Sequence, residues 1–211
     1  MKFDRKQLLL YAVTDRRWTG EKTLLQQVEE AIEGGVTCVQ LREKELDEAA
    51  FLEEAKAMRE LCHKHGVPLI IDDHWKIALE SGADGVHVGI EDDSVADIRA
   101  AAGSDFIIGA TAKTVEQAKS AAAQGADYLG VGAVFPSPTK PGAIRITTEQ
   151  LRTICQSVEL PAVAIGGISL ANAAELAGGG MDGIAVVSAI FAADDIPAAA
   201  RELKALITTM V

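Results

Sequence analysis

Cysteine is scarce in this chain, and its three residues are too far apart to act together. Cys38, Cys62 and Cys155 include no Cys-x-x-Cys pair. Because closely spaced cysteines are the usual mark of zinc sites and of disulfide frameworks, we expect neither here. Cys38 lies within an apolar run, so we interpret it as a small buried hydrophobic residue.

Long hydrophobic runs are also missing. No apolar stretch approaches the roughly 18 residues that a membrane-spanning helix needs. Near the N-terminus, charged residues precede a run of three leucines at positions 8–10, which is too short for the apolar region of a signal peptide. We therefore expect a cytoplasmic protein that does not bind membranes.

A surplus of positive charge is the third absence. The formal net charge is −11 over 211 residues, and the sequence pI is near 4.8. Because nucleic-acid-binding proteins neutralise phosphates with Lys and Arg, we expect no nucleic-acid partner. A small phosphorylated ligand stays open, since an acidic protein can still gather a few cations in one cleft.

Short apolar runs alternate with longer segments of helical period along the chain. Each run is too short for a helix and too apolar for an exposed strand, which favours parallel strands buried on both faces. Helical segments lie between them, such as 45–65 and 114–124, with Asp47 and Thr114 as predicted N-caps. The predicted strands are 9–13, 38–41, 69–71, 86–88, 106–109, 128–131, 162–165 and 184–187.

A similar phrase leads into every second predicted strand. It begins at Gly34, Gly82, Gly125 and Gly180, and each glycine suits the left-handed end of a helix. A repeat of two strand–helix units is what an eightfold barrel produces. The sequence therefore predicts a single (β/α)8 TIM barrel over residues 1–211, with an open doubly wound sheet as the main alternative.

Acidic residues follow two neighbouring predicted strands. In a (β/α) barrel the active site lies at the C-terminal ends of the strands, where Asp72, Asp73 and Asp92 would be found. Carboxylates of this kind suit Mg²⁺, which usually takes one or two of them together with substrate phosphates. Helix capping by Asp73 and Asp92 is the alternative interpretation.

Basic residues follow the second, fifth and sixth predicted strands. They are Arg42, Lys44, Lys113 and Lys140, and any one of them alone could be a solvated loop charge. A rim that combines these cations with the carboxylates suits a diphosphate bridged by Mg²⁺.

The last two predicted strands end in features that suit a phosphate. Gly166 and Gly167 permit a close backbone approach, and helices that begin after both strands would direct N–H groups at an anion. A plain tight turn is the alternative for the glycine pair. His87 alternates with valines inside its strand, so we interpret it as a satisfied interior residue without a role.

Eight motifs occur in order between about residues 10 and 190: YAVTD (11–15), VQLREK (39–44), IIDD (70–73), GVHVG (85–89), ADYLGVG (126–132), PSPTK (136–140), AIGGI (164–168) and VVSA (186–189). Together they resemble the thiamine phosphate synthase family, although each motif alone is a weak signal. The resemblance implies a Mg²⁺-dependent transferase that joins a pyrimidine diphosphate to a thiazole phosphate and releases diphosphate. It also implies a dissociative mechanism, in which the diphosphate leaves before the thiazole nitrogen captures a pyrimidine-methylene cation.

The resemblance also implies roles for individual residues. Asp73 and Asp92 would ligate Mg²⁺. Arg42, Lys44 and Lys140 would be catalytic residues that stabilise the charge of the leaving diphosphate. Thr111 stands where the family usually has a serine. The substrate-binding set would be Gln40, Arg42, Lys44, Asp72, Thr111, Ser137, Thr139, Lys140, Gly167, Val187 and Ser188.

Besides Thr111, five residues depart from the family pattern, of which Ser137 in place of a usual threonine is a mild change. Asp72 replaces a usual asparagine, His74 a usual arginine, Ile90 a frequent glutamine and Lys113 a usual histidine. The alternatives are a thiazole tautomerase of the same superfamily, a phosphate-binding barrel isomerase and a non-catalytic barrel that binds a phosphorylated ligand. Homo-oligomer formation is left open by the sequence.

Overall fold

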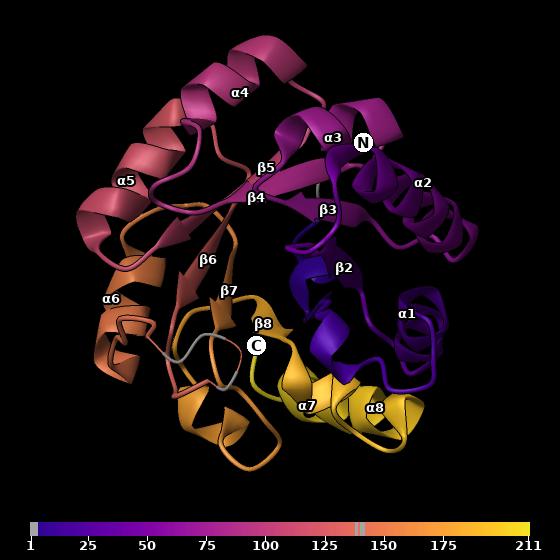
Figure 1. The fold of residues 1–211 in the computed structure, drawn as a ribbon. Helices are drawn as coiled ribbons and strands as arrows, with labels where there is room; N and C mark the ends of the chain where they lie inside the picture. The colour runs from indigo at the N-terminus through magenta and orange to yellow at the C-terminus, as the bar shows by residue number, and fades with distance from the viewer. Residues whose placement is uncertain (1–3, 138, 140–141) are drawn as a thin grey trace.

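The computed structural model describes residues 4–137, 139 and 142–211, and these form a closed barrel of eight parallel strands. Consecutive strands are neighbours, and the first pairs with the last through Tyr11 and Ala185. Helices surround the strands on the outside (Figure 1). The predicted (β/α)8 barrel is confirmed, and the open sheet is wrong because this sheet closes on itself.

The strands begin within two residues of their predicted positions, and most also end there. They are β1 Leu10–Val13, β2 Cys38–Leu41, β3 Leu69–Asp72, β4 Gly85–Val88, β5 Ile107–Ala112, β6 Tyr128–Gly132, β7 Ala162–Ile165 and β8 Gly183–Val186. The main difference is β5, which continues three residues further than expected. Thr111 therefore lies within a strand instead of in the loop after it.

Helices follow all strands but one among the described residues. They are α1 Leu24–Glu33, α2 Glu48–Lys64, α3 Trp75–Ser81, α4 Val95–Ala102, α5 Val115–Gln124, α6 Thr148–Gln156, α7 Ser188–Phe191 and α8 Ile196–Thr208. The side chains of Asp47 and Thr114 accept backbone N–H bonds at the starts of α2 and α5, as predicted. After β7 only a short 3-10 helix forms, η3 at Ala173–Leu176, so the expected helix there is reduced to one turn.

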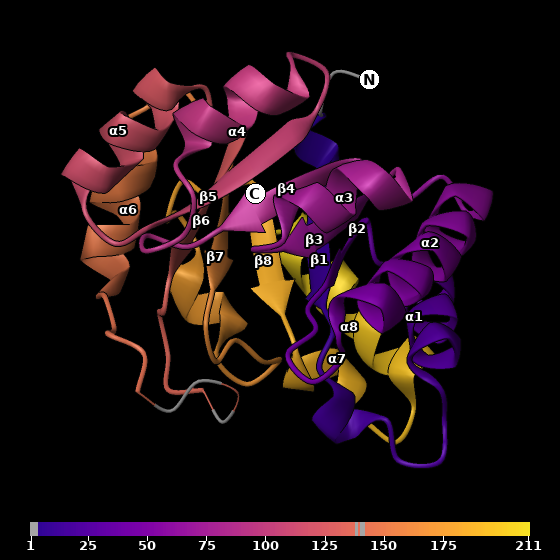
Figure 2. The ribbon, with the colours of Figure 1, turned by 45° about the horizontal axis from the view of Figure 1, so that its top comes forward.

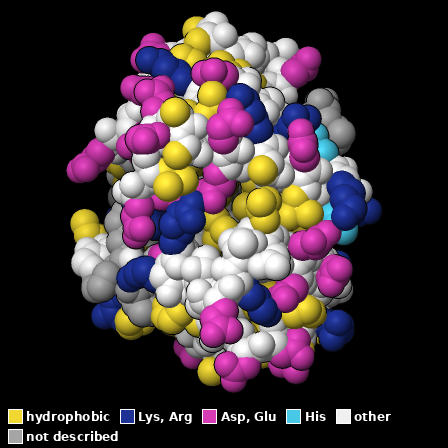
Figure 3. All heavy atoms as spheres, turned by 45° about the vertical axis from the view of Figure 1, so that its right-hand side comes forward, with side chains coloured by type: hydrophobic (Ala, Val, Ile, Leu, Met, Phe, Trp, Pro, Cys, Tyr) yellow, Lys and Arg dark blue, Asp and Glu magenta, His cyan; other side chains and the backbone are white. Residues whose placement is uncertain are grey.

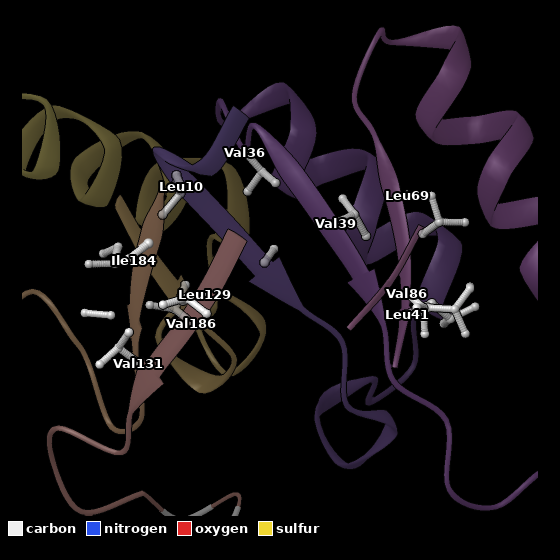
Figure 4. Close-up of a cluster of buried hydrophobic side chains, with 14 of the residues drawn as sticks. Leu10, Val36, Val39, Leu41, Leu69, Val86, Leu129, Val131, Ile184 and Val186 are labelled. Carbon is white, nitrogen blue, oxygen red and sulfur yellow. The ribbon is translucent and has the colours of Figure 1, made fainter. Parts of the chain in front are cut away.

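Side chains alternate along each strand between the barrel interior and the surrounding helices. The inner cluster contains Tyr11, Cys38 and Tyr128, so the predicted burial of Cys38 is confirmed. The outer cluster joins the strands to the helices, and Figure 4 shows part of it, including Leu10 and Val39. This outer layer accounts for the continuous apolar character of the strands.

The repeated phrase has a structural purpose at the N-terminal ends of the strands. In each copy, the side chain of the polar residue just before an even-numbered strand accepts a backbone N–H from the first or second residue of the odd-numbered strand beside it. The four pairs are Thr37 with Leu10, Asp84 with Leu69, Asp127 with Ile108 and Asp182 with Ala162, at 2.8–2.9 Å. These bonds satisfy strand-end donors that have no ladder partner.

Two exterior features bear on the class of the protein. Among the described residues, no helix combines the length and the hydropathy needed to cross a bilayer. Acidic and basic side chains are interspersed on the face seen in Figure 3. A cytoplasmic location and a homo-oligomer both stay predictions.

Candidate active site

All eight strands run in one direction, so the loops after them meet at one end of the barrel (Figure 2). A cavity of about 210 Å³ opens at this end. It is lined by Asp15, Arg16, Arg17, Arg42, Glu43, Lys44, Glu45 and Thr139. The cavity brings together the loops after β1, β2 and β6, which are far apart in the sequence.

Charged side chains of opposite sign alternate along the edge of this cavity. Arg42 lies 3.7 Å from Asp15 on one side and 3.7 Å from Asp72 on the other. Lys44 then lies 3.2 Å from Asp72 and 2.7 Å from Asp73. The structure therefore assembles the mixed-charge rim that was expected from the residues after β2 and β3.

Lys44 is held as a cation by these neighbours. Burial would lower the pKa of its ammonium group, but the hydrogen bond to Asp73 and the charge of Asp72 outweigh burial and raise it. Asp72 is only 13% exposed and serves both Arg42 and Lys44. The carboxylate that departs from the family pattern is thus offset by two cations.

Asp73 and Asp92 lie close enough to influence each other. Burial, and then the neighbouring Asp73, raises the pKa of Asp92. Neither carboxylate caps a helix: α3 begins after His74 without a side-chain bond, and α4 is capped by Ser94. The capping interpretation is therefore wrong for both.

This pair of carboxylates fits a magnesium ion. Two hard anionic oxygens in contact repel each other until a cation lies between them, and Mg²⁺ commonly takes one or two carboxylates. No cluster of three or more His, Cys, Asp or Glu side chains that could hold a metal occurs in residues 4–137, 139 and 142–211. A magnesium ion bound here would take its other ligands from substrate phosphate and water.

Glu43 organises the loop that carries Arg42 and Lys44. Its side chain is 1% exposed, and its Oε1 accepts the backbone N–H groups of Lys44 at 2.7 Å and Glu45 at 2.6 Å. Its Oε2 pairs with Arg16. Burial would raise the pKa of Glu43, but the backbone bonds and Arg16 outweigh burial and lower it. The carboxylate stays ionised and sets the path of the loop.

A chain of uncharged polar groups crosses the barrel interior beneath the rim. Gln40 Nε2 donates to Tyr11 Oη at 3.0 Å, and the hydroxyls of Tyr11 and Tyr128 are 2.8 Å apart. His87 lies between Tyr128 Oη and Thr111 Oγ1, at 3.1 Å from each. Gly109 makes room for this chain, because a Cβ there would lie 2.1 Å from the Tyr128 ring.

The chain is neutral as well as polar. Burial lowers the pKa of His87 to about 4, and the carboxylates of Asp73 and Asp92 offset this only in part. Burial also raises the pKa of Tyr11 and Tyr128 well above the usual value. The interpretation of His87 as a satisfied interior residue is confirmed, because its two ring nitrogens bond to Tyr128 and Thr111.

The loops after β6 and β7 hold each other through their backbones. Gly167 has φ +65°, and a Cβ on it would lie 2.1 Å from the carbonyl oxygen of Pro136. The contact with Pro136 therefore requires glycine at position 167, and phosphate binding by the glycine pair stays a prediction. Ser137 Oγ accepts the N–H of Thr139 at 3.2 Å, and Thr139 Oγ1 is buried with no partner among the described residues.

The remaining expected residues divide into three groups. Val187 packs against the inner cluster and directly precedes α7, whose first residue is Ser188. Lys140 lies outside the described residues. Lys113 lines a separate cavity of about 330 Å³ beside the starts of α5 and α6, so it is not part of the described rim.

Sequence reasoning assigned no role to Asp15, Arg17, Glu43, Tyr11 or Tyr128. All but Arg17 fall in motifs that were noted, but Asp and Glu in loops are common, and tyrosines in strands usually pack in cores. Glu43 had one signal in the sequence: it is an acidic residue between Arg42 and Lys44, two cations that need a fixed backbone.

Known proteins are similar to this chain in sequence and in fold. A family model described as thiamine monophosphate synthase matches residues 10–190. The thiamine-phosphate synthase of Chloroflexus aurantiacus is 48% identical over 200 residues, covering 94% of this chain and 92% of that protein. A thiamine phosphate pyrophosphorylase structure from Pyrococcus furiosus has a TM-score of 0.90 at 40% identity, with 98% of each chain covered.

Some relatives are longer. The chloroplastic thiamine biosynthetic bifunctional enzyme of Arabidopsis thaliana is 45% identical over 206 residues, which cover 95% of this chain and 40% of the plant protein. This chain therefore spans about two fifths of that relative and corresponds to one part of it. With a match over most of its length and the same closed barrel, the chain belongs to the thiamine monophosphate synthase family.

Proposed function

We propose that this protein is a thiamine phosphate synthase. It joins 4-amino-2-methyl-5-hydroxymethylpyrimidine diphosphate to 4-methyl-5-(2-phosphoethyl)thiazole and releases diphosphate. The observation that carries the proposal is the alternating rim of Arg42, Asp72, Lys44 and Asp73 at the C-terminal end of a barrel of this family. Such a rim suits a highly charged leaving group, which neither cations nor Mg²⁺ would neutralise alone.

The diphosphate end of the substrate binds at the rim. Arg42 and Lys44 exchange their carboxylate partners for phosphate oxygens, and Lys140 acts from the loop after β6. Asp73 and Asp92 hold Mg²⁺, which supplies positive charge for the departing diphosphate. Because the cations are already oriented by fixed carboxylates, little reorganisation is needed as the C–O bond breaks.

The pyrimidine ring binds over the neutral polar chain. Gln40 and Thr111 face the substrate, while His87 and the two tyrosines hold them in place. Neutral His87 adds no positive charge below a ring that becomes cationic, which suits a dissociative step. Burial raises the pKa of the Cys38 thiol, so no ionised thiol lies in the interior to trap the cation.

The thiazole phosphate binds beside the diphosphate, at the loops after β6, β7 and β8, the first of which supplies Thr139 to the same cavity. The residues proposed for this role come from the loops after β6, β7 and β8: Ser137, Thr139, Gly167, Val187 and Ser188. Phosphates commonly bind at the loops after the seventh and eighth strands in this fold. The Thr139 hydroxyl, which is buried without a partner in the part of the chain that the structure describes, supports this placement, because a buried hydroxyl without a bond is costly unless a ligand completes it. Capture of the pyrimidine-methylene cation by the thiazole nitrogen then forms thiamine phosphate.

A turnover assay with both substrates and Mg²⁺ tests the activity. We expect thiamine phosphate and diphosphate to form in equal amounts, and no product without Mg²⁺. Isomerisation of a thiazole phosphate without coupling would indicate a tautomerase instead. Absence of any turnover, with binding of a phosphorylated ligand, would indicate a non-catalytic barrel.

The dissociative step has its own test. Replacing the pyrimidine methyl group with trifluoromethyl destabilises a ring cation, so the single-turnover rate should fall strongly. A rate that hardly changes, when chemistry limits turnover, would rule out the cation.

A further inference from the structure

Arg17 is a cation at the cavity to which the proposed function assigns no role. It lies in η2, a single 3-10 turn at Arg16–Trp18 that follows β1. Its side chain is 51% exposed and lines the same cavity as Arg42 and Lys44. Its hydrogen bonds distinguish it from an ordinary surface arginine, whose guanidinium is not held in one orientation.

Asp15 holds the Arg17 guanidinium in one orientation. Asp15 accepts bonds from Arg17 Nη2 at 2.8 Å, from Nε at 3.1 Å and from the backbone N–H at 3.1 Å. The Asp15 side chain is only 6% exposed, and its hydrogen bonds to Arg17 lower its pKa. Two parallel hydrogen bonds donated to one carboxylate fix the plane of a guanidinium, whereas unpaired surface arginines sample many rotamers.

Arg17 also connects two loops that frame the cavity. Its Nη2 donates to the carbonyl oxygen of Thr139 at 3.3 Å, across 122 positions of sequence. Thr139 belongs to the loop after β6 and lines the same cavity as Arg42 and Lys44, which come from the loop after β2. No acceptor for Arg17 Nη1 is found in the described part of the chain, so this donor remains available to a ligand.

Arg17 is paired less completely than its neighbour Arg16. Asp15 is the one carboxylate partner of Arg17 among the described residues, and it also lies 3.7 Å from Arg42. Arg16 differs, because both Glu43 and Glu54 pair with it. Of these two neighbouring arginines, Arg17 has fewer carboxylate partners and the more exposed side chain, 51% against 30%.

We propose that Arg17 is a further binding residue for the diphosphate group, and that Asp15 is the positioning residue that aims it. This inference rests on the proposed function. Arg17 then completes the cationic side of the cavity beside Arg42. Its bond to Thr139 keeps the loop after β6 close to the diphosphate.

The test measures diphosphate binding as well as turnover. Arg17→Met keeps most of the side-chain stem and removes the guanidinium. Calorimetric titration of the full chain with diphosphate and Mg²⁺ should show a Kd about tenfold higher than wild type, as expected for one lost charged hydrogen bond. The KM for the pyrimidine diphosphate should rise similarly, while the KM for thiazole phosphate stays within about twofold.

Two further variants separate binding from general charge and from structure. Lys22→Met removes one positive charge from a surface pair with Glu30 and should leave the diphosphate Kd unchanged. Asp15→Asn keeps the shape of the positioning residue and should weaken diphosphate binding in the same direction as Arg17→Met. An effect of Lys22→Met equal to that of Arg17→Met would show that net charge alone matters, which overturns the inference.

Other outcomes also decide the matter. A Kd within about twofold of wild type for Arg17→Met overturns the inference, and so does an equal rise in both KM values, which indicates a general distortion of the loops. A wild-type protein that binds diphosphate but forms no thiamine phosphate would refute the proposed function, while the titration would still report on Arg17.

Discussion

Replacing Glu43 with glutamine should destabilise the protein and misplace Arg42 and Lys44, the side chains that we propose bind diphosphate. One oxygen of Glu43 accepts backbone N–H bonds from Lys44, Glu45 and Leu46, at 2.7, 2.6 and 3.3 Å. The other oxygen pairs with Arg16. Glutamine has one acceptor oxygen, so its NH₂ group must face either the backbone donors or the guanidinium.

The magnitude follows from the bonds that are lost. Hydrogen bonds to a charged partner contribute about 1.5–3 kcal/mol each, and the side chain is 1% exposed, so water cannot replace them. We expect the free energy of unfolding to fall by about 2–3 kcal/mol. A displacement of about 1 Å at Arg42 and Lys44 should also lower kcat/KM for the pyrimidine diphosphate by about 100-fold.

The assay combines urea unfolding with steady-state kinetics. Glu53→Gln is the matched control, because Glu53 is 74% exposed and pairs only with Lys56 at the surface. This control should change the free energy of unfolding by less than about 0.5 kcal/mol.

The pH dependence gives a second readout. The folded-state pKa of Glu43 lies below the unfolded value of about 4.3, so the carboxylate stabilises the fold above that pH. Its contribution is lost as the pH falls through the folded-state pKa. The stability difference between wild type and Glu43→Gln should therefore be full at neutral pH and shrink below about pH 4. A difference that is absent at neutral pH, or constant down to pH 3, would refute the reasoning.

Three further predictions concern the metal site, the interior and the thiols. Asp73→Asn and Asp92→Asn should each raise the Mg²⁺ concentration for half-maximal rate by at least about tenfold, with the fold retained. Asparagine is chosen because Asp73 has φ +60°, which asparagine tolerates. An unchanged Mg²⁺ dependence in both variants would exclude the metal assignment. Gly109→Ala places a Cβ 2.1 Å from the Tyr128 ring and should lower the free energy of unfolding by about 1–3 kcal/mol in urea, which an unchanged midpoint would contradict. Cys62 is fully buried with a pKa raised to about 12, so it should resist iodoacetamide at pH 8 until the chain unfolds, and rapid labelling of the native protein would show that this burial is wrong.

The barrel could be predicted because its information is local. Strands buried on both faces must be continuously apolar, and helices between them keep their own period, so the alternation is visible without any long-range contact. The repeated phrase is local too, since a polar residue precedes the strand in every copy. The predicted left-handed helix end is confirmed at Gly82 and Gly125, but it is wrong at Gly34, which ends α1 with φ −72°, and at Gly180, which lies after the C-cap Ala177 of η3. What a strand cannot reveal alone is where it stops: β5 runs on to Ala112 because β6 supplies ladder partners that far, while β4 pairs with it as far as Ala110.

The candidate site was predicted only in part. Asp72, Asp73, Arg42 and Lys44 were expected at neighbouring strand ends, and they do meet there. Lys113 was expected with them but lines a different cavity, because a loop residue's position in sequence does not determine which way its side chain extends.

The sequence by itself determined the order of strands and helices, the end of the barrel where the chemistry gathers, and the residue types available there. Only the tertiary structure decided which charges are partners. Asp15 shares its carboxylate between Arg17 and Arg42, and Glu43 faces Arg16, because strands from distant parts of the chain place their loops side by side. The polar chain from Gln40 to Thr111 likewise draws its side chains from five strands, β1, β2, β4, β5 and β6. Pairings of this kind depend on distances of a few ångströms between segments separated by tens of residues, and no local pattern contains that information.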